Sequence, residues 1–442
     1  MRHVDYAAIE ANGIFVDAWT SYSFQSDLFT PADAFRLTLG VGTSASRDLR
    51  KTLDWLAILL RPDAEVKLWI GSGDARGLQG IGIVDACEIG NDADGGTTLS
   101  VSGRDPARHL IGSAADPKLY EKNDTLLSVA RRAVAPWSIE VTADHVAGRD
   151  LRQARVRKDK LRRLQDKARA LGIPPKYMSE KIAASIDKGT IDFADFAGRF
   201  LEQETDLTVL RARALGIPVQ SSGPNLSSLQ IYQLRVKDIR PQSGESVWEF
   251  LDRHAQRNGL LMQMDPKGRL VFCGLQYDQQ PSYRLVRRIE GNRNENNILT
   301  GGRRQDASDI YKTVLVYGRT KNDDKTRSPF KGRAVDESMP FEKVLQLHDN
   351  SIRSKDDAQT RAEYELGKSR QGADVLEYTV FGHSANGLVY ATDTIAHVDD
   401  QVAGVNGPFY VTSRTFTRNA QTGPLTQLRL VPVGSIRLKE AA

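Results

Sequence analysis

A glycine-rich segment follows an early strand-like run and could cradle a phosphate group. It reads Gly71-Ser72-Gly73-Asp74-Ala75-Arg76-Gly77. Glycines after a strand bind phosphate when a helix N-terminus points at the anion. The spacing differs from the dinucleotide-binding fingerprint, and the residues after Gly77 predict another strand instead of a helix. We therefore interpret this segment as a turn.

The segment Asp92-Ala93-Asp94-Gly95 has the residue types of a calcium-binding loop. If Gly95 takes the sixth position of such a loop, Gly90 takes the first, and no glutamate stands at the twelfth. The first position needs an acidic ligand, which glycine cannot supply. The composition instead predicts a hairpin connection.

Residues suited to metal binding or nucleophilic catalysis are scattered along the chain. Cys87 and Cys273 each lie in an apparent strand, so we expect two buried thiols and neither a disulfide nor a zinc site. His254 lies on a predicted helix, where a surface or partly buried histidine is expected. We assign no catalytic, cofactor-binding or metal-binding residue and expect no cofactor, because the histidines form no His-Glu-x-x-His motif and no close pair. They stand at positions 3, 109, 145, 254, 348, 383 and 397.

A cell-wall hydrolase is one alternative function. The chain has no Gly-x-Ser-x-Gly elbow, and 56 acidic residues make any choice of two glycosidase carboxylates arbitrary without geometry. That alternative requires turnover of peptidoglycan that is lost when one or two carboxylates are changed.

Residues 149–169 are strongly basic and suggest a second alternative, nucleic-acid binding. Lysine and arginine dominate this stretch, and Leu161, Leu164, Ala168 and Leu171 recur at helical intervals. Cations on such a helix could neutralise phosphates. A solvated helix face paired with acidic neighbours explains the same pattern. Salt-sensitive DNA binding that is lost on deletion of 149–218 would favour the alternative.

The length of 442 residues suggests two to four domains, and the composition, 40% hydrophobic and 26% charged, is that of a globular protein. No apolar run approaches the length of a membrane span, and the first residues lack the core of a signal peptide. We expect synthesis in the host cytoplasm. The formal charge of +5 does not by itself predict nucleic acid as a partner.

Alternating apolar residues predict an antiparallel sheet or barrel in the first part of the chain. Strand-forming runs occupy 14–41, with a turn at 30–33, and 66–70; they continue through 80–89 and 97–103. The small sheet ends by about residue 112.

The middle of the chain predicts helices and a hairpin. The segment 168–174 recurs unchanged at 212–218, and each copy ends a helical pattern with glycine and proline. Residues 229–236 predict a strand. Ser246-Val247-Trp248-Glu249 matches a capping box, and residues 260–273 match a hairpin with a turn at 265–268. We expect Trp248 to lie in the core, together with Trp69 and Trp137.

The last third returns to strands. Tyr311–Tyr317 predicts a strand, residues 355–371 predict a polar helix, and strands alternate with turns from Val375 to Val431. The fold class is therefore β-rich α+β, a layout that fits an assembly protein better than a single catalytic cleft.

In this order the motifs resemble a known family, the baseplate hub proteins of Mu-like contractile tails. That family includes the late control protein D and tail protein P group and is related to the N-terminal part of type VI secretion spike proteins. The similarity covers most of the chain outside 149–225. It rests on Val101-Ser102-Gly103-Arg104-Asp105, residues 241–251, Arg333-Ala334-Val335-Asp336, residues 361–365, Val380-Phe381-Gly382-His383, residues 387–390, Pro408-Phe409-Tyr410-Val411-Thr412-Ser413 and residues 426–430.

The resemblance implies two small antiparallel β-barrels flanking an α/β domain that carries a helical insertion. The barrels would be residues 1–112 and 291–442, which dock on the tail tube as a ring. The α/β domain would be residues 113–148 and 226–290, a cup for the spike, and residues 149–225 would be the basic helical insertion.

The resemblance also implies a homotrimeric, non-enzymatic hub in the tail baseplate of the virion. Two similar barrels in each of three copies would imitate six-fold symmetry. The implied partners are the chain itself, a trimeric spike protein, the tail tube protein or tube initiator, the baseplate wedge proteins and, as a further candidate, the tape measure protein. Membrane and nucleic acid are not expected as partners.

Overall fold

The computed structural model describes residues 6–41, 47–71, 77–92, 96–118, 125–143, 241–257, 260–318 and 330–435, apart from gaps at 276, 278, 292, 338, 350–351, 353 and 386–387. All of these residues belong to one compact unit, Met1–Asp144 with Ser222–Ala442. Within this unit, residues 222–240 are among those not described. The predicted basic helix at 149–169, the repeated segment and the predicted strand at 229–236 lie outside the described residues.

A 13-stranded sheet forms the body of the described chain, and its first half comes from the N-terminal residues. The strand order is β3-β4-β7-β6-β5-β1-β2, and every neighbouring pair is antiparallel. Alternate residues of β5 are buried, as expected for a strand with one face on a core. The elements are β1 (Tyr6–Ala11), β2 (Ile14–Val16), β3 (Ser21–Asp27), β4 (Ala34–Val41), α1 (Arg47–Leu59), β5 (Glu65–Gly71), β6 (Gly77–Asp92) and β7 (Gly96–Arg104).

The second half of the sheet comes from the C-terminal residues. Its order is β12-β16-β21-β20-β19-β11, with β11 parallel to β19 and the other pairs antiparallel. A short pair, β17 (Ser384–Ala385) and β18 (Leu388–Val389), precedes β19. The main strands are β11 (Tyr283–Arg287), β12 (Ile298–Gln305), β16 (Asp374–Phe381), β19 (Thr394–Asp400), β20 (Val405–Asn419) and β21 (Gly423–Pro432).

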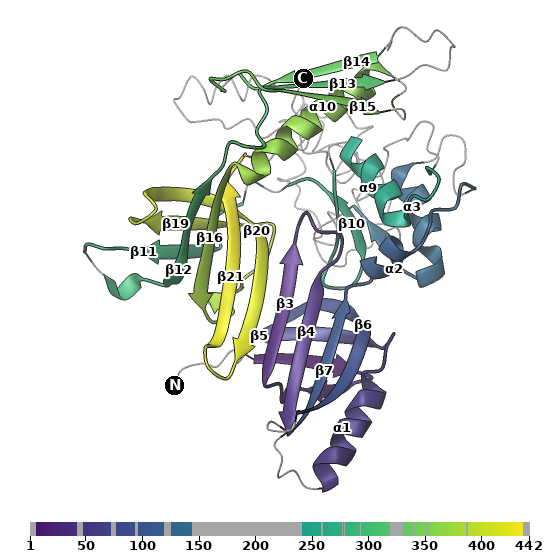
Figure 1. Ribbon diagram of the computed structural model, residues 1–442, viewed down its shortest axis with the longest axis vertical. Coiled ribbons are helices and arrows are strands. Elements are labelled where there is room, and N and C mark those ends of the chain that lie inside the picture. The colour runs from purple at the N-terminus through teal and green to yellow at the C-terminus, as the bar shows by residue number, and fades with distance from the viewer. Residues whose placement is uncertain are drawn as a thin grey trace, which may run out of the picture. The chain divides into compact units, whose positions relative to one another are not determined.

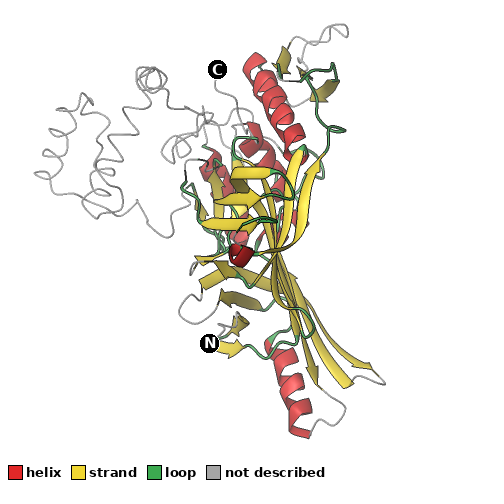
Figure 2. Cartoon of the chain, turned by 90° about the vertical axis from the view of Figure 1, so that its left-hand side faces the viewer, coloured by secondary structure: helices red, strands yellow, loops and turns green. Residues whose placement is uncertain are grey.

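The two halves are joined by one strand pair, β20 with β3. The yellow β20 runs beyond β19, and its distal residues pair with the purple β3 from Ser413↔Asp27 to Arg418↔Tyr22 (Figure 1). The strands thus continue from one half into the other (Figure 2). One apolar core extends through both halves, including Leu37 and Val101 of the first and Leu376 and Leu430 of the second.

Helices and a short sheet follow the N-terminal strands. The sheet order is β8-β10-β9, and a separate apolar core includes Leu126, Phe250 and Phe272. Glu249 N–H donates to Ser246 Oγ at 3.2 Å, and Ser246 N–H donates to Glu249 Oε2 at 2.9 Å, which confirms the predicted capping box. The elements are α2 (Ala107–Gly112), α3 (Leu126–Val134), η1 (Ala135–Trp137), β8 (Val141–Thr142), α9 (Val247–Arg257), β9 (Leu261–Met264) and β10 (Leu270–Cys273).

A third sheet lies within the C-terminal sequence, between β12 and β16. Its order is β14-β13-β15, and α10 covers it with Ala358, Ala362 and Leu366. Gly332 permits this approach, because a Cβ there would lie 2.0 Å from the Ala358 carbonyl oxygen. The elements are β13 (Thr313–Gly318), β14 (Phe330–Val335), β15 (Val344–Asp349), α10 (Lys355–Ser369) and η4 (Arg370–Gly372).

The structure confirms the β-rich α+β class and the predicted hairpins, whereas the described strands form no closed barrel. Two expectations for aromatic and thiol groups are wrong. Trp248 is buried and Trp137 packs against the same core, partly buried, but Trp69 is only half-buried because it lies on the outer face of β5. Cys273 is buried and Cys87 is only half-buried. Burial raises the pKa of both thiols.

Candidate docking surface at the edge of the sheet

A hollow of about 390 Å³ opens beside β12, the strand at the edge of the C-terminal half of the sheet. Among the described strands β12 pairs only with β16, so its outer edge has no strand partner, although the Gly301 carbonyl accepts a hydrogen bond from Arg287. Two glycines lie in this strand. Gly301 has a φ of +124°, and a Cβ there would lie 1.9 Å from the Glu377 carbonyl oxygen. The hollow is lined by Arg287, Gly301, Gly302, Arg303, Gln305, Val402 and Ala403.

Arg287 closes one side of the hollow and connects β11 to β12. Its guanidinium donates to Asp400 Oδ1 at 2.9 Å, to Asp400 Oδ2 at 2.6 Å and to the Gly301 carbonyl oxygen at 2.8 Å. The hydrogen bond to Asp400 raises the pKa of Arg287. Since the Asp400 side chain is fully buried, this two-pronged bond is shielded from water.

Asp400 stays charged although it is buried. Burial alone would raise the pKa of this carboxyl group, but hydrogen bonds from Arg287 and from Tyr378 Oη, at 2.7 Å, lower it below its usual value. The Arg287 guanidinium also lies 5.6 Å from the centre of the Tyr378 ring. This ion pair fixes β11, β12, β16 and β19 relative to one another.

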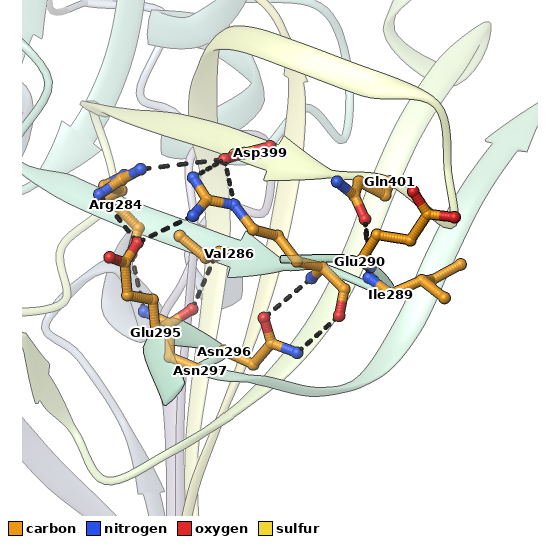
Figure 3. A network of polar contacts seen from close by, with 10 residues as sticks. Arg284, Val286, Ile289, Glu290, Glu295, Asn296, Asn297, Asp399 and Gln401 are labelled. Carbon is orange, nitrogen blue, oxygen red and sulfur yellow. Dashed lines mark hydrogen bonds and ion pairs between the residues drawn. The ribbon is translucent and has the colours of Figure 1, made fainter. Parts of the chain in front are cut away.

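A second, more exposed network lies on the outer side of β11 (Figure 3). Arg288 donates to Asp399 Oδ2 at 2.6 Å and to Glu295 Oε2 at 3.2 Å. Arg284 contacts the same two carboxylates at 3.8 and 3.4 Å. Because these groups are partly solvated, water and salt weaken the ion pairs of this network.

Two asparagines cover the free edge of β11. Asn297 Oδ1 accepts from Val286 N–H at 2.8 Å, and Asn297 Nδ2 donates to the Arg284 carbonyl at 2.7 Å. Asn296 forms the same pair of bonds with the backbone of Arg288 (Figure 3). These side chains occupy the place of a neighbouring strand. As a result β11 offers little open edge, whereas β12 does.

The surface around the hollow combines apolar and cationic groups. Ile289, Leu299 and Val402 are 51%, 53% and 58% exposed. Arg303 is held by Asp374 at 2.6 Å and Arg304 by Asp306 at 2.7 Å. Arginine beside apolar groups is typical of the centre of a protein interface. Asp374, Asp306 and Asp400 are paired with arginines, and the arrangement is suited to binding.

The residues considered for chemistry lie elsewhere. Gly71 ends β5 and Gly77 begins β6, so the glycine-rich segment connects two antiparallel strands, as expected. Asp92 pairs with Gly96 at the end of the β6–β7 hairpin, which confirms a hairpin connection there. Residues 72–76 and 93–95 are not described. His254 is buried, contrary to expectation, and packs edge-on against Phe250.

The described part of the chain contains no cluster of three or more histidine, cysteine or acidic residues able to hold a metal. Within the same ranges, no helix has the length and hydrophobicity to span a bilayer.

The arginines of this surface were not identified from the sequence. A signal was present, because Arg287-Arg288 and Gly301-Gly302-Arg303-Arg304 interrupt strand-like runs with charge and glycine, as edge strands do. The partner that holds Arg287 at this surface is Asp400 of β19, more than a hundred residues away in the sequence.

Residues 212–274 match a family model described as "Baseplate hub protein gp44-like, second domain". The structure is similar to the tail protein from Neisseria meningitidis MC58, with a TM-score of 0.65, 20% identity and coverage of 99% of both chains. It is also similar to the 43 kDa tail protein of prophage MuSo2 from Shewanella oneidensis, with a TM-score of 0.63, 17% identity and coverage of 98% of this chain and 99% of that one. No curated protein matches the sequence.

A lower likeness, with a TM-score of 0.45 and 8% identity, links 98% of the chain to 79% of an E. coli component of the type VI secretion system. The family model and the two prophage tail proteins confirm the resemblance to baseplate hub proteins, and the chain has the fold of prophage tail proteins.

Proposed function

We propose that the chain is a structural hub protein in the baseplate of a contractile phage-type tail, and that it is not an enzyme. The observation that carries this proposal is a structural repeat within the chain. The two halves of the main sheet have matching strand orders, β3-β4-β7-β6-β5-β1 and β12-β16-β21-β20-β19-β11, in the same sequence order along the chain. A chain with two such units can offer two similar surfaces to a ring-shaped partner.

The domain division follows the two halves. Residues 1–112 and 291–442 are the β-rich units that dock on the tube, and residues 113–148 with 226–290 form the cup for the spike. Residues 149–225 are an insertion. Strand β11, within 226–290, completes the C-terminal unit through its pairing with β19.

The assembly is a homotrimer that adapts three-fold to six-fold symmetry. A trimer that binds a hexameric tube with only one surface per chain leaves half of the tube subunits unmatched. Two similar units per chain remove this mismatch. The proposed partners are the spike protein, the tail tube protein or tube initiator, and the wedge proteins, with the tape measure protein as a further candidate, all in the virion tail.

Light scattering of the purified full-length chain tests the proposal. We expect a particle of three times the chain mass of 49.0 kDa. Mixing with the neighbouring tail proteins should then yield stable complexes with the tube and spike components. A strictly monomeric particle, or one that hydrolyses peptidoglycan, would contradict it.

A further inference from the structure

The internal repeat extends to individual residues. Hairpins β6–β7 and β20–β21 each contain one register shift, between Val84 and Ala86 in the first and between Val411 and Ser413 in the second. The second strand of each hairpin begins with a glycine in the left-handed region, Gly96 at φ +89° and Gly423 at φ +70°. Counting from the shift to the glycine, the two hairpins correspond residue for residue.

Strands β3 and β12 correspond in the same way. Asp27 Oδ1 accepts from Phe29 N–H at 2.8 Å, and Asp306 Oδ1 accepts from Ser308 N–H at 2.9 Å. Both aspartates therefore end their strand with the same side-chain turn. Strand β3 pairs with β4 as β12 pairs with β16. In this alignment Phe24 corresponds to Arg303.

The chain uses one of these hairpins to join its own halves. Beyond its register shift, β20 pairs with β3, and Phe416 lies opposite Phe24. Phe416 is 1% exposed and Phe24 is 6% exposed, so this pair is covered by the common core. Within the chain, β20 of one half thus pairs with the edge strand β3 of the other half.

The equivalent edges of the other two strands are open among the described residues. Beyond its register shift, β6 pairs only with β7, and Glu88, Ile89 and Gly90 are exposed. Ile89, which corresponds to Phe416, is 48% exposed. Strand β12, which corresponds to β3, pairs only with β16.

We propose that β6 of one copy pairs antiparallel with β12 of a second copy, as β20 pairs with β3 within the chain. This inference rests on the proposed homotrimer and specifies its interface. The intrachain register, transferred to these strands, places Glu88 opposite Arg304, Ile89 opposite Arg303 and Gly90 opposite Gly302.

The side chains are complementary in this register. Directly opposite residues of an antiparallel pair share a face. Glu88 then meets Arg304, whose side chain is 75% exposed, on the outer face. On the inner face Ile89 lies beside Arg303 and Gly301, at the hollow lined by Val402 and Ala403. An exposed isoleucine would thus fill an exposed hollow.

The proposed pairing is compatible with a closed ring of three copies. Each chain contributes one intrachain junction, β20 with β3, and one interchain junction, β6 with β12. A ring of three copies contains six such junctions and leaves neither edge open.

Disulfide crosslinking tests the register in the full-length chain. In a Cys87→Ser background that keeps the buried Cys273, we introduce E88C with R304C and oxidise the protein. Opposite Cα atoms in an antiparallel pair lie within disulfide range. We expect covalent dimers and trimers, nothing larger than three chains, and reversal by a reductant.

The matched control carries E88C with R303C. Residues 303 and 304 point to opposite faces of β12, so this pair should crosslink at least tenfold more slowly. Equal rates for both pairs, or no crosslink in either, would overturn the proposed pairing. Each single cysteine variant should remain uncrosslinked.

A charge exchange gives a second readout. E88R and R304E should each weaken trimer association at least tenfold, and the double variant E88R/R304E should recover most of it, as measured by light scattering over a dilution series. If the wild type is a trimer but the double variant is no better than the singles, this interface is wrong and the proposed hub function stands. If the wild type is a monomer, the homotrimer proposal itself fails.

Discussion

Asp399 and Asp400 are neighbours in β19 whose carboxylates have different surroundings. The side chain of Asp400 is fully buried and bound by Arg287 and Tyr378, whereas that of Asp399 is 16% exposed and bound by Arg288. A buried charge that loses its partner is destabilising, but an exposed one is resolvated. The pair therefore provides a matched comparison between two aspartates one residue apart.

We expect Asp400→Asn to lower the free energy of unfolding by roughly 2–4 kcal/mol, because the fully buried carboxylate that binds Arg287 and Tyr378 is replaced by a neutral amide. Asp399→Asn should cost less than about 1 kcal/mol. Urea denaturation at neutral pH measures both. Equal effects would show that burial does not distinguish the two ion pairs.

The pH dependence of the Asp400→Asn effect follows from the lowered pKa of Asp400. A carboxyl group whose pKa is depressed in the folded state stabilises the protein above its unfolded pKa. This contribution is lost as the pH falls through the folded pKa. The difference in the free energy of unfolding between wild type and Asp400→Asn should be largest near neutral pH and should decrease in acid.

At the scale of the element, β12 is an edge strand with two glycines that have different roles. Gly301 has a positive φ and its Cα faces the Glu377 carbonyl, whereas a Cβ at Gly302 would contact no atom within 4 Å. The first glycine is required by the backbone, whereas a side chain would fit at the second.

Gly301→Ala should destabilise the chain by about 2 kcal/mol or more, because alanine is strained at this φ and its Cβ overlaps the neighbouring strand. Gly302→Ala should change the free energy of unfolding by less than about 0.5 kcal/mol. Thermal unfolding of the two variants compares them directly. A similar loss of stability in both variants would show that the conformation of Gly301 is not the cause.

Sequence patterns predicted most elements correctly where the signal is local. The Ser246 to Glu249 spacing identified the start of α9, and the 265–268 turn identified the β9–β10 hairpin. Of the sheet of β13, β14 and β15, only the strand at Tyr311–Tyr317 was predicted. Strand β15 pairs in parallel with β13 although β14 lies between them in the sequence. Such a pairing has no short-range pattern in the sequence.

In the whole molecule, the main sheet makes its two halves interdependent. Phe416 lies at the β20–β3 junction in the core that both halves share, whereas Phe381 at the end of β16 is 57% exposed. Removing a buried ring at the junction should weaken both halves at once.

Phe416→Ala should lower the free energy of unfolding by about 3–5 kcal/mol. Hydrogen exchange should speed up in strands of both halves. Phe381→Ala, the exposed control, should change stability by less than about 0.5 kcal/mol. Faster exchange confined to β20 and β21 would mean that the halves unfold independently.

By itself the sequence determined the β-rich α+β class, the hairpins, the capped helix and the resemblance to baseplate hub proteins, because alternation, turn residues and caps act between residues close together in the chain. The tertiary structure alone decided the β20–β3 junction, the partner of β11, the arginine surface beside β12 and the half-burial of Trp69 and Cys87. These features depend on which distant strands become neighbours, and the free energy that selects those neighbours comes from the common core.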